Sequence, residues 1–199
     1  GSCELKIEVQ RNAITSIFSS QLPVVEKTNF VVTLEQLSAD ANPVFITQNE
    51  FMRRMKDMSA MQGGGGMMSF YGEMPDSYNL VVNTAHPLIE KLLKDEAEIT
   101  GAEITPLKAQ YSELNSKKEA LSASHKDKKD EEIPPAEKDE LKELVKKLEE
   151  ISEKEKAIYK SYGDSNKQVS QLIDLALLAS NMLKGEPLAR FVKRSVELL

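Results

Sequence analysis

The sequence predicts an α+β fold, in which strands from the first part of the chain combine with helices from the rest. Three observations lead to this prediction. β-Rich runs dominate the first 46 residues, leucines at heptad spacing recur between 99 and 162, and strongly apolar helical stretches fill 168–199. We therefore expect a sheet-forming part, an inserted antiparallel helical hairpin and a C-terminal pair of helices.

Composition and charge narrow the class of protein. The chain has 199 residues, 40% of them hydrophobic, which is enough for a real core. Its net charge of −6 does not favour nucleic acid as a partner, and it has no apolar run of the roughly 18 to 20 residues that would cross a membrane. Cys3 is the sole cysteine, so a reducing, cytoplasmic location is expected. Gly1 and Ser2 are expected to be a cloning scar on a piece of a longer protein.

Four short runs are predicted to be strands. "LKIEVQ" at 5–10 alternates apolar and polar residues, and "AITSIF" at 13–18 follows it. "NFVVTLEQL" at 29–37 and "YNLVVN" at 78–83 are rich in β-branched and aromatic residues. The sheet is therefore expected to begin at the start of the chain.

A methionine-rich helix is predicted between the third and fourth of these runs. Thr47 followed by Glu50 has the spacing of a capping box, so a helix should run from about Gln48 to Met61. One side of this helix is apolar, and charged residues occupy the other side. The apolar side consists of Phe51, Met52, Met55, Met58 and Met61.

Methionine is unbranched and polarizable, so a face of methionines suits a surface that accepts different partners. The glycine run 63–66 that follows would let the next apolar side chains move as a group. These side chains are Met67, Met68, Phe70 and Tyr71. The alternative is that the methionine face is ordinary core.

The segment 99–162 is rich in lysine, glutamate and leucine. Its two halves each repeat apolar residues at heptad spacing: Leu107, Tyr111, Leu114 and Leu121 in the first, and Leu141, Leu144, Leu148, Ile151, Ile158 and Tyr162 in the second. The polar stretch between them contains two prolines, which favours an antiparallel hairpin. A helix with Pro87 in its first turn leads into it. The alternative is a disordered charged linker, which would not explain the sustained apolar seam.

The last segment, 168–199, is predicted to form two apolar helices separated by a turn with Gly185 as a C-cap and Pro187 at the next start. They could pack on the sheet of their own chain. Alternatively, a second copy could supply the same pair, giving a four-helix bundle in a homodimer. The expected interface residues are Leu172, Ile173, Ala176, Ala179, Met182, Leu183, Leu188, Phe191, Val192 and Val196.

The sequence offers no catalytic residues and no metal site. His86 and His125 lie far apart in the sequence, and one cysteine without matching histidines does not form a zinc site. The glycine run lacks the lysine and hydroxyl residue of a phosphate-binding loop. We expect no catalytic activity and no cofactor in this segment.

Three stretches resemble a known family. "NPVFITQNEFMRRMKDM", "YNLVVNTAHPLI" and above all "LIDLALLASNMLKGEPLARFVKRSVELL" are similar to the C-terminal domain of heat-shock protein 90 chaperones in their bacterial form, high-temperature protein G. The resemblance covers most of 5–89 and 168–199. It implies a small mixed sheet packed by helices, with ATP and magnesium bound in a separate N-terminal domain. The hairpin at 99–162 is longer than in most members, so no family role extends to it.

The resemblance also implies functions for two surfaces. It implies that the last two helices dimerise the chaperone, and that the methionine face and the side chains after the glycine run contact unfolded clients. The chain ends in "SVELL", not in the acidic tail that binds tetratricopeptide co-chaperones, so such partners are not expected. Two other hypotheses stay open: a coiled-coil adaptor whose charged hairpin binds a protein partner, and an enzyme with a hidden site.

Overall fold

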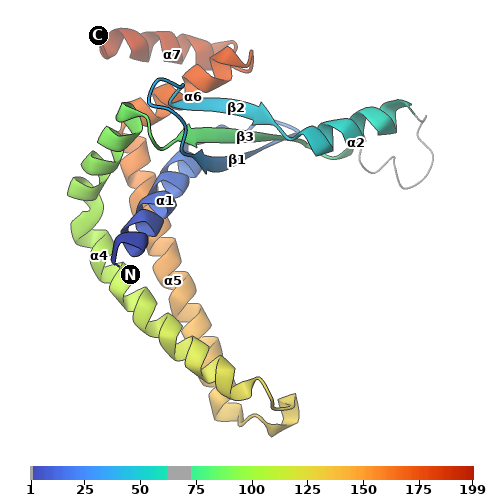
Figure 1. The fold of residues 1–199 in the computed structure, drawn as a ribbon, viewed down its shortest axis with the longest axis vertical. Helices are drawn as coiled ribbons and strands as arrows, with labels where there is room; N and C mark the ends of the chain where they lie inside the picture. Colours follow the sequence, from blue (N-terminus) through green and yellow to red (C-terminus); the bar gives the residue numbers. More distant parts are fainter. Residues whose placement is uncertain (1, 62–72) are drawn as a thin grey trace. The chain divides into compact units, whose positions relative to one another are not determined.

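The computed structural model describes residues 2–61 and 73–199, which form two compact units (Figure 1). The first unit combines Gly1–Lys94 with Gly163–Leu199, and the second is Asp95–Tyr162. The first unit contains a three-stranded mixed sheet with helices, which confirms the α+β class. Where the chain is described, it contains no helix that is both long and apolar enough to span a membrane.

The first element is a helix, α1, at Ser2–Gln21, so the prediction of strands at 5–10 and 13–18 is wrong. Ala13, Ile14, Ile17 and Phe18 are all buried. Their spacing of one, three and four residues fits one side of a helix and not the two-residue period of a strand. Nearer the N-terminus Ile7 is exposed and Val9 is half-buried, so the alternation that suggested a strand does not mark a buried face.

The sheet consists of β1 (Thr28–Glu35), β2 (Val44–Gln48) and β3 (Asp76–Asn83) in the order β1-β3-β2. β1 runs parallel to β3, and β2 runs antiparallel to it. The strands predicted at 29–37 and 78–83 are confirmed, whereas β2 was not singled out. β3 is the central strand, and its last four residues are buried.

α2 spans Glu50–Met61, close to the predicted helix. The predicted capping box is wrong, because Thr47 lies in β2. Asn49 caps the helix instead, since its side-chain oxygen accepts a hydrogen bond of 3.2 Å from the backbone N–H of Met52.

The second unit is built from parts of two long helices, α4 (Pro87–His125) and α5 (Pro135–Ser165), joined through a short 3₁₀ turn at Asp130–Glu132. The seam residues Leu144, Leu148 and Ile151 of α5 are buried, as a heptad pattern requires. Tyr111, which was also expected in the seam, is exposed.

The chain ends with α6 (Lys167–Ala179) and α7 (Glu186–Glu197). α6 packs against β2 and α1, and α7 packs against α6. Gly185 is not a C-cap as predicted: it precedes α7 at the N-cap position, with φ of +65°, a conformation that favours glycine. Asn181, with φ of +56°, adopts the left-handed conformation in the turn after α6.

Candidate functional site

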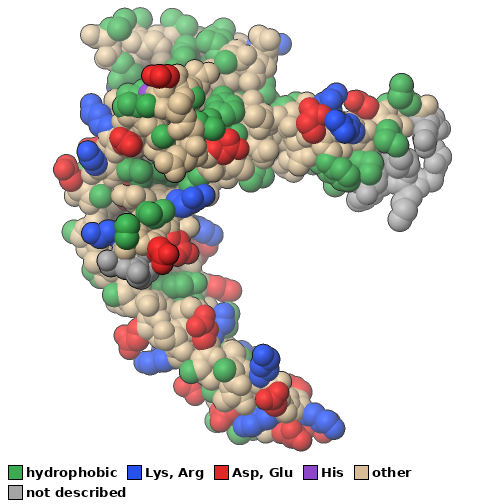
Figure 2. Space-filling model, viewed as in Figure 1, with side chains coloured by type: hydrophobic (Ala, Val, Ile, Leu, Met, Phe, Trp, Pro, Cys, Tyr) green, Lys and Arg blue, Asp and Glu red, His purple; other side chains and the backbone are tan. Residues whose placement is uncertain are grey.

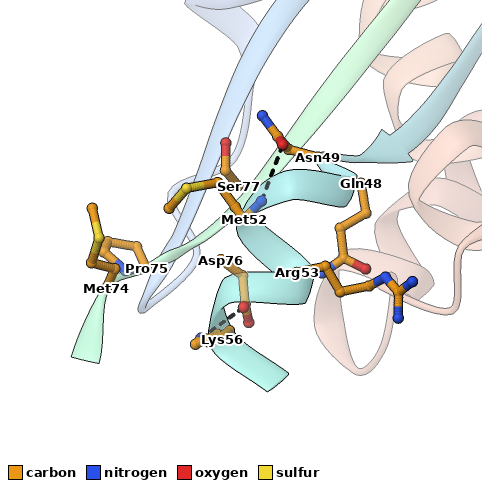
Figure 3. A pocket seen from close by; sticks show the side chains of 9 residues that line it. All are labelled: Gln48, Asn49, Met52, Arg53, Lys56, Met74, Pro75, Asp76 and Ser77. Atoms are coloured by element: carbon orange, nitrogen blue, oxygen red, sulfur yellow. Dashed lines mark hydrogen bonds and ion pairs between the residues drawn. The ribbon is translucent and has the colours of Figure 1, made fainter. Parts of the chain in front are cut away.

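α2 belongs to the first unit and contacts the rest of it mainly at the beginning of the helix and along one flank. At the start, Asn49 caps the helix, and further along Lys56 Nζ forms an ion pair of 2.7 Å with Asp76 Oδ1 of β3. Figure 3 shows these contacts around a small hollow between α2 and β3. Met52 and Met74 line the same hollow. The rest of the helix makes few contacts with the other described elements.

The predicted methionine face divides into two parts. Met52 and Met55 are half-buried. Phe51, Met58 and Met61 are exposed; Phe51 keeps 62% and Met61 88% of its surface accessible. Figure 2 shows hydrophobic and charged side chains next to each other along this helix. The residues Met67, Met68, Phe70 and Tyr71 lie outside the described part of the chain.

The polar side of α2 stabilises the helix from within. Arg53 pairs with Glu50 at 3.0 Å and with Asp57 at 3.4 Å, and Arg54 approaches Glu50 at 3.6 Å. The hydrogen bond and charge of Glu50 raise the pKa of Arg53. Pairs three and four residues apart on a helix face stabilise an exposed helix.

The predicted dimer interface also divides into two parts. Leu172, Ile173, Ala176, Leu183 and Phe191 are buried in their own chain. Met182 and Leu188 are half-buried, and Ala179, Val192 and Val196 are exposed. About half of the set therefore belongs to the core of the single chain.

Two exposed leucines on α6 were missed from that set. Leu175 and Leu178 lie on the side of α6 away from buried Ile173 and Leu177. Val192 and Val196 of α7 are exposed apolar residues as well. The sequence could have indicated these two leucines. A helix that is apolar on all sides can pack only one side on its own sheet, so its other apolar side needs a second partner.

Polar contacts tie the two helices together. Arg194 Nε donates to Gln171 Oε1 at 2.8 Å, and its guanidinium also pairs with Asp174. Lys167 and Glu197 form a second pair at 3.0 Å, which lowers the pKa of Glu197. α6 and α7 are thus held together by contacts along both helices.

The titratable residues considered in the sequence serve structural contacts. His125 Nε2 lies 2.6 Å from Glu137 Oε2 and joins the ends of α4 and α5, while His86 Nδ1 accepts a hydrogen bond from the Leu88 N–H. Cys3 is exposed. In the ranges that the structure describes, no three His, Cys, Asp or Glu residues are grouped so as to hold a metal ion.

Comparison with curated proteins finds several relatives. The chain is 49% identical over 190 residues to the chaperone protein HtpG of Bacteroides thetaiotaomicron and 48% identical over 190 residues to that of Bacteroides fragilis. It is 46% identical over 197 residues to the HtpG of Porphyromonas gingivalis. These matches cover 96–98% of this chain but only 28% of each relative, in its C-terminal part.

The part of this chain that the relatives leave unmatched is shorter than the hairpin. Most of the hairpin is therefore matched in these relatives as well. No family model matches the chain, and no solved structure matches it.

Proposed function

The chain belongs to the HtpG chaperone family, within heat-shock protein 90, and from this we propose that it is the dimerisation and client-contacting domain of an ATP-dependent chaperone that assists protein folding. It spans about 28% of the length of the matched relatives. The observation that carries the client-contacting role is the exposed apolar side of α2.

An exposed apolar group on a helix held by its other side suits transient binding. Phe51, Met58 and Met61 are accessible without any rearrangement of the described chain. Methionine adapts its shape to different apolar surfaces, and the neighbouring arginines and acids keep the helix soluble. These features support binding of unfolded or partly folded polypeptides of varied sequence.

The dimerisation role is supported by the exposed residues on α6 and α7. Leu175, Leu178, Val192 and Val196 remain accessible after both helices have packed on their own chain. A group of apolar residues at one surface is typical of an interface. A second copy would cover it with the same residues and form the four-helix arrangement.

The client-contacting proposal is tested by replacing Phe51 and Met58 with Glu. Both residues are exposed, so the charges cost little stability, but they should oppose apolar clients. Suppression of the aggregation of heat-denatured citrate synthase should fall severalfold. The control is Ala60→Glu, which places one such charge on an exposed position at the other side of α2, and the single variants Phe51→Glu and Met58→Glu match it in charge.

Equal loss in the Ala60 variant would mean that charge alone weakens binding. If neither variant reduces the suppression of aggregation, the α2 site is rejected. A large drop in melting temperature for the Phe51 and Met58 variant would mean that these residues belong to a core.

The proposal extends to cofactors and location. We propose that this domain binds no nucleotide itself, needs no metal and works in the cytoplasm. In the resembling family, nucleotide binds in another domain. Calorimetry with ATP and magnesium should give no binding heat, and stoichiometric binding would contradict the proposal. The coiled-coil adaptor alternative receives no support from the relatives, which are chaperones.

A further inference from the structure

β1 is an edge strand whose outer side is open. It pairs with β3 alone, and the sheet order leaves no strand on its other side in residues 2–61 and 73–199 (Figure 1). The other edge strand is β2, and a helix packs against each edge strand: α1 against β1 and α6 against β2.

The hydrogen bonds fix which backbone groups of β1 face outward. Asp76 N donates to Lys27 O and Thr84 N donates to Glu35 O, each at 2.9 Å. In a parallel ladder, alternate residues bond the same neighbour, so the odd-numbered residues of β1 face β3. The even-numbered residues direct their N–H and C=O groups to the open edge.

Only the first of these outward groups has a partner in the described chain. Thr28 N donates to Val25 O at 3.2 Å. Phe30, Val32 and Leu34 follow, and no described residue bonds their outward backbone groups. Three successive pairs of donors and acceptors thus form a template for one more strand.

A groove runs along this edge. It has a volume of about 470 Å³ and lies between β1, the C-terminal part of α1 and the turn at 22–24. No charged side chain is among its lining residues, and Val24 and Val31 contribute exposed apolar surface to it. The residues that line it are Thr15, Ser19, Leu22, Pro23, Val24, Thr28, Asn29, Phe30, Val31 and Val32.

The edge also lacks the usual protection. Soluble proteins blunt exposed edge strands with lysine, proline, bulges or covering elements. Thr28–Leu34 contains neither proline nor a charged residue, and Val31 is 52% exposed. Such an edge is an aggregation hazard unless another chain binds it.

We propose that the groove beside β1 binds an extended, uncharged segment of a non-native polypeptide, which pairs with Phe30, Val32 and Leu34 as a fourth strand. Recognition comes mainly from the peptide backbone, so it tolerates many sequences. This inference rests on the proposed chaperone function and adds a second client-binding surface, separate from α2. A second copy of the chain is the competing occupant of such an edge, and sedimentation distinguishes it from a peptide.

The test uses the full chain and a fluorescein-labelled peptide, acetyl-Ser-Val-Thr-Val-Thr-Val-Ser-amide, followed by fluorescence anisotropy. The critical variant is Val32→Pro, which removes an outward N–H but no hydrogen bond to β3. Its affinity should fall roughly tenfold, the effect of one lost strand hydrogen bond. A peptide N-methylated at alternate residues keeps the side chains, yet it should not bind.

Val31→Lys provides a second variant that leaves every backbone group in place. The lysine adds an edge charge at an exposed position and should weaken binding severalfold. Val145→Lys makes the same change at an exposed valine of α5 and should leave binding unchanged. Melting curves from circular dichroism test whether each variant is folded. If Val32→Pro does not fold, the affinity of Val31→Lys decides the case.

Several outcomes would overturn the inference. Equal affinity of wild type and Val31→Lys, or binding of the N-methylated peptide, would mean that the edge is not used. A change in sedimentation without a change in peptide affinity would assign the edge to a second copy. If the α2 variants lose client protection while the peptide never binds, this inference fails and the proposed function stands.

Discussion

Replacing Leu178 with Asp should dissociate the proposed dimer without unfolding the protomer. Leu178 is on the exposed side of α6, and five apolar side chains of α6 and the last helix share this accessibility, at 37–67% exposed. The others are Leu175, Val192, Val196 and Leu198.

The structure limits the energy available to the interface. A large apolar side chain contributes about 1.5–3 kcal/mol when it is fully buried from water. Since these residues are already about half-buried, each adds roughly half of that value, or ~7–15 kcal/mol for ten side chains on two copies. Association costs about 4–15 kcal/mol, so little excess remains.

A twofold interface loses the same leucine twice. The lost burial is then about 1.5–3 kcal/mol, and two carboxylates facing apolar surface add to it. The lost burial alone should raise the dissociation constant by about 10- to 160-fold, and the two carboxylates should raise it further. Sedimentation velocity over a range of micromolar concentrations measures this change.

Two controls separate the interface from the core. Val145→Asp adds the same charge at an exposed valine of α5 and should leave the dimer intact. Ile173→Asp places a charge in the core of the single chain and should unfold it. An unchanged dimer in Leu178→Asp, or a protomer that melts many degrees lower at low concentration, would refute the reasoning.

Three further predictions concern the rest of the chain. Burial raises the pKa of Glu96, and the hydrogen bond from Thr100 opposes this shift only in part, so the charged form of Glu96 destabilises the fold. Glu96→Gln should therefore raise the melting temperature at pH 7. This gain should vanish below about pH 4.5, where Glu96 is protonated in both the folded and the unfolded chain. Gly101→Ala, with open space around the new methyl group, should stabilise α4 by about 0.5–1 kcal/mol in denaturant titration, whereas Gly163→Ala should not, because its Cβ would lie 2.9 Å from Gln21. Lys56→Ala should lower the helix content by circular dichroism and weaken client protection, since it removes the pair with Asp76; unchanged protection would mean that this pair does not hold α2.

The sequence predicted the helices best where many residues repeat one period. The seam of α5 and the apolar residues of α6 each extend over several turns, so single exceptions such as exposed Tyr111 do not obscure the pattern. The first helix was taken for strands because Leu5, Ile7 and Val9 alternate over only five residues. Short alternation of this kind is ambiguous without tertiary contacts to decide it.

The interface could be predicted only in part, for a different reason. An apolar residue at a given helical position indicates that something covers it, but not whether its own chain or a second copy does so. Ile173 and Val192 both fitted the interface hypothesis, and packing on β2 and α1 separates buried Ile173 from exposed Val192. Leu175 and Leu178 were missed for the same reason.

The way α2 is held explains why part of its apolar side, with Phe51, Met58 and Met61, is exposed. A helix of 12 residues is marginal in water, so it needs a cap, internal ion pairs or packing. An amphipathic helix normally obtains the packing through its apolar side. Here Asn49 caps it, Glu50 and Arg53 pair within it, and Lys56 attaches its flank to Asp76. Because polar contacts hold the helix, Phe51 is not needed for the fold, and its exposure follows from the way the helix is attached.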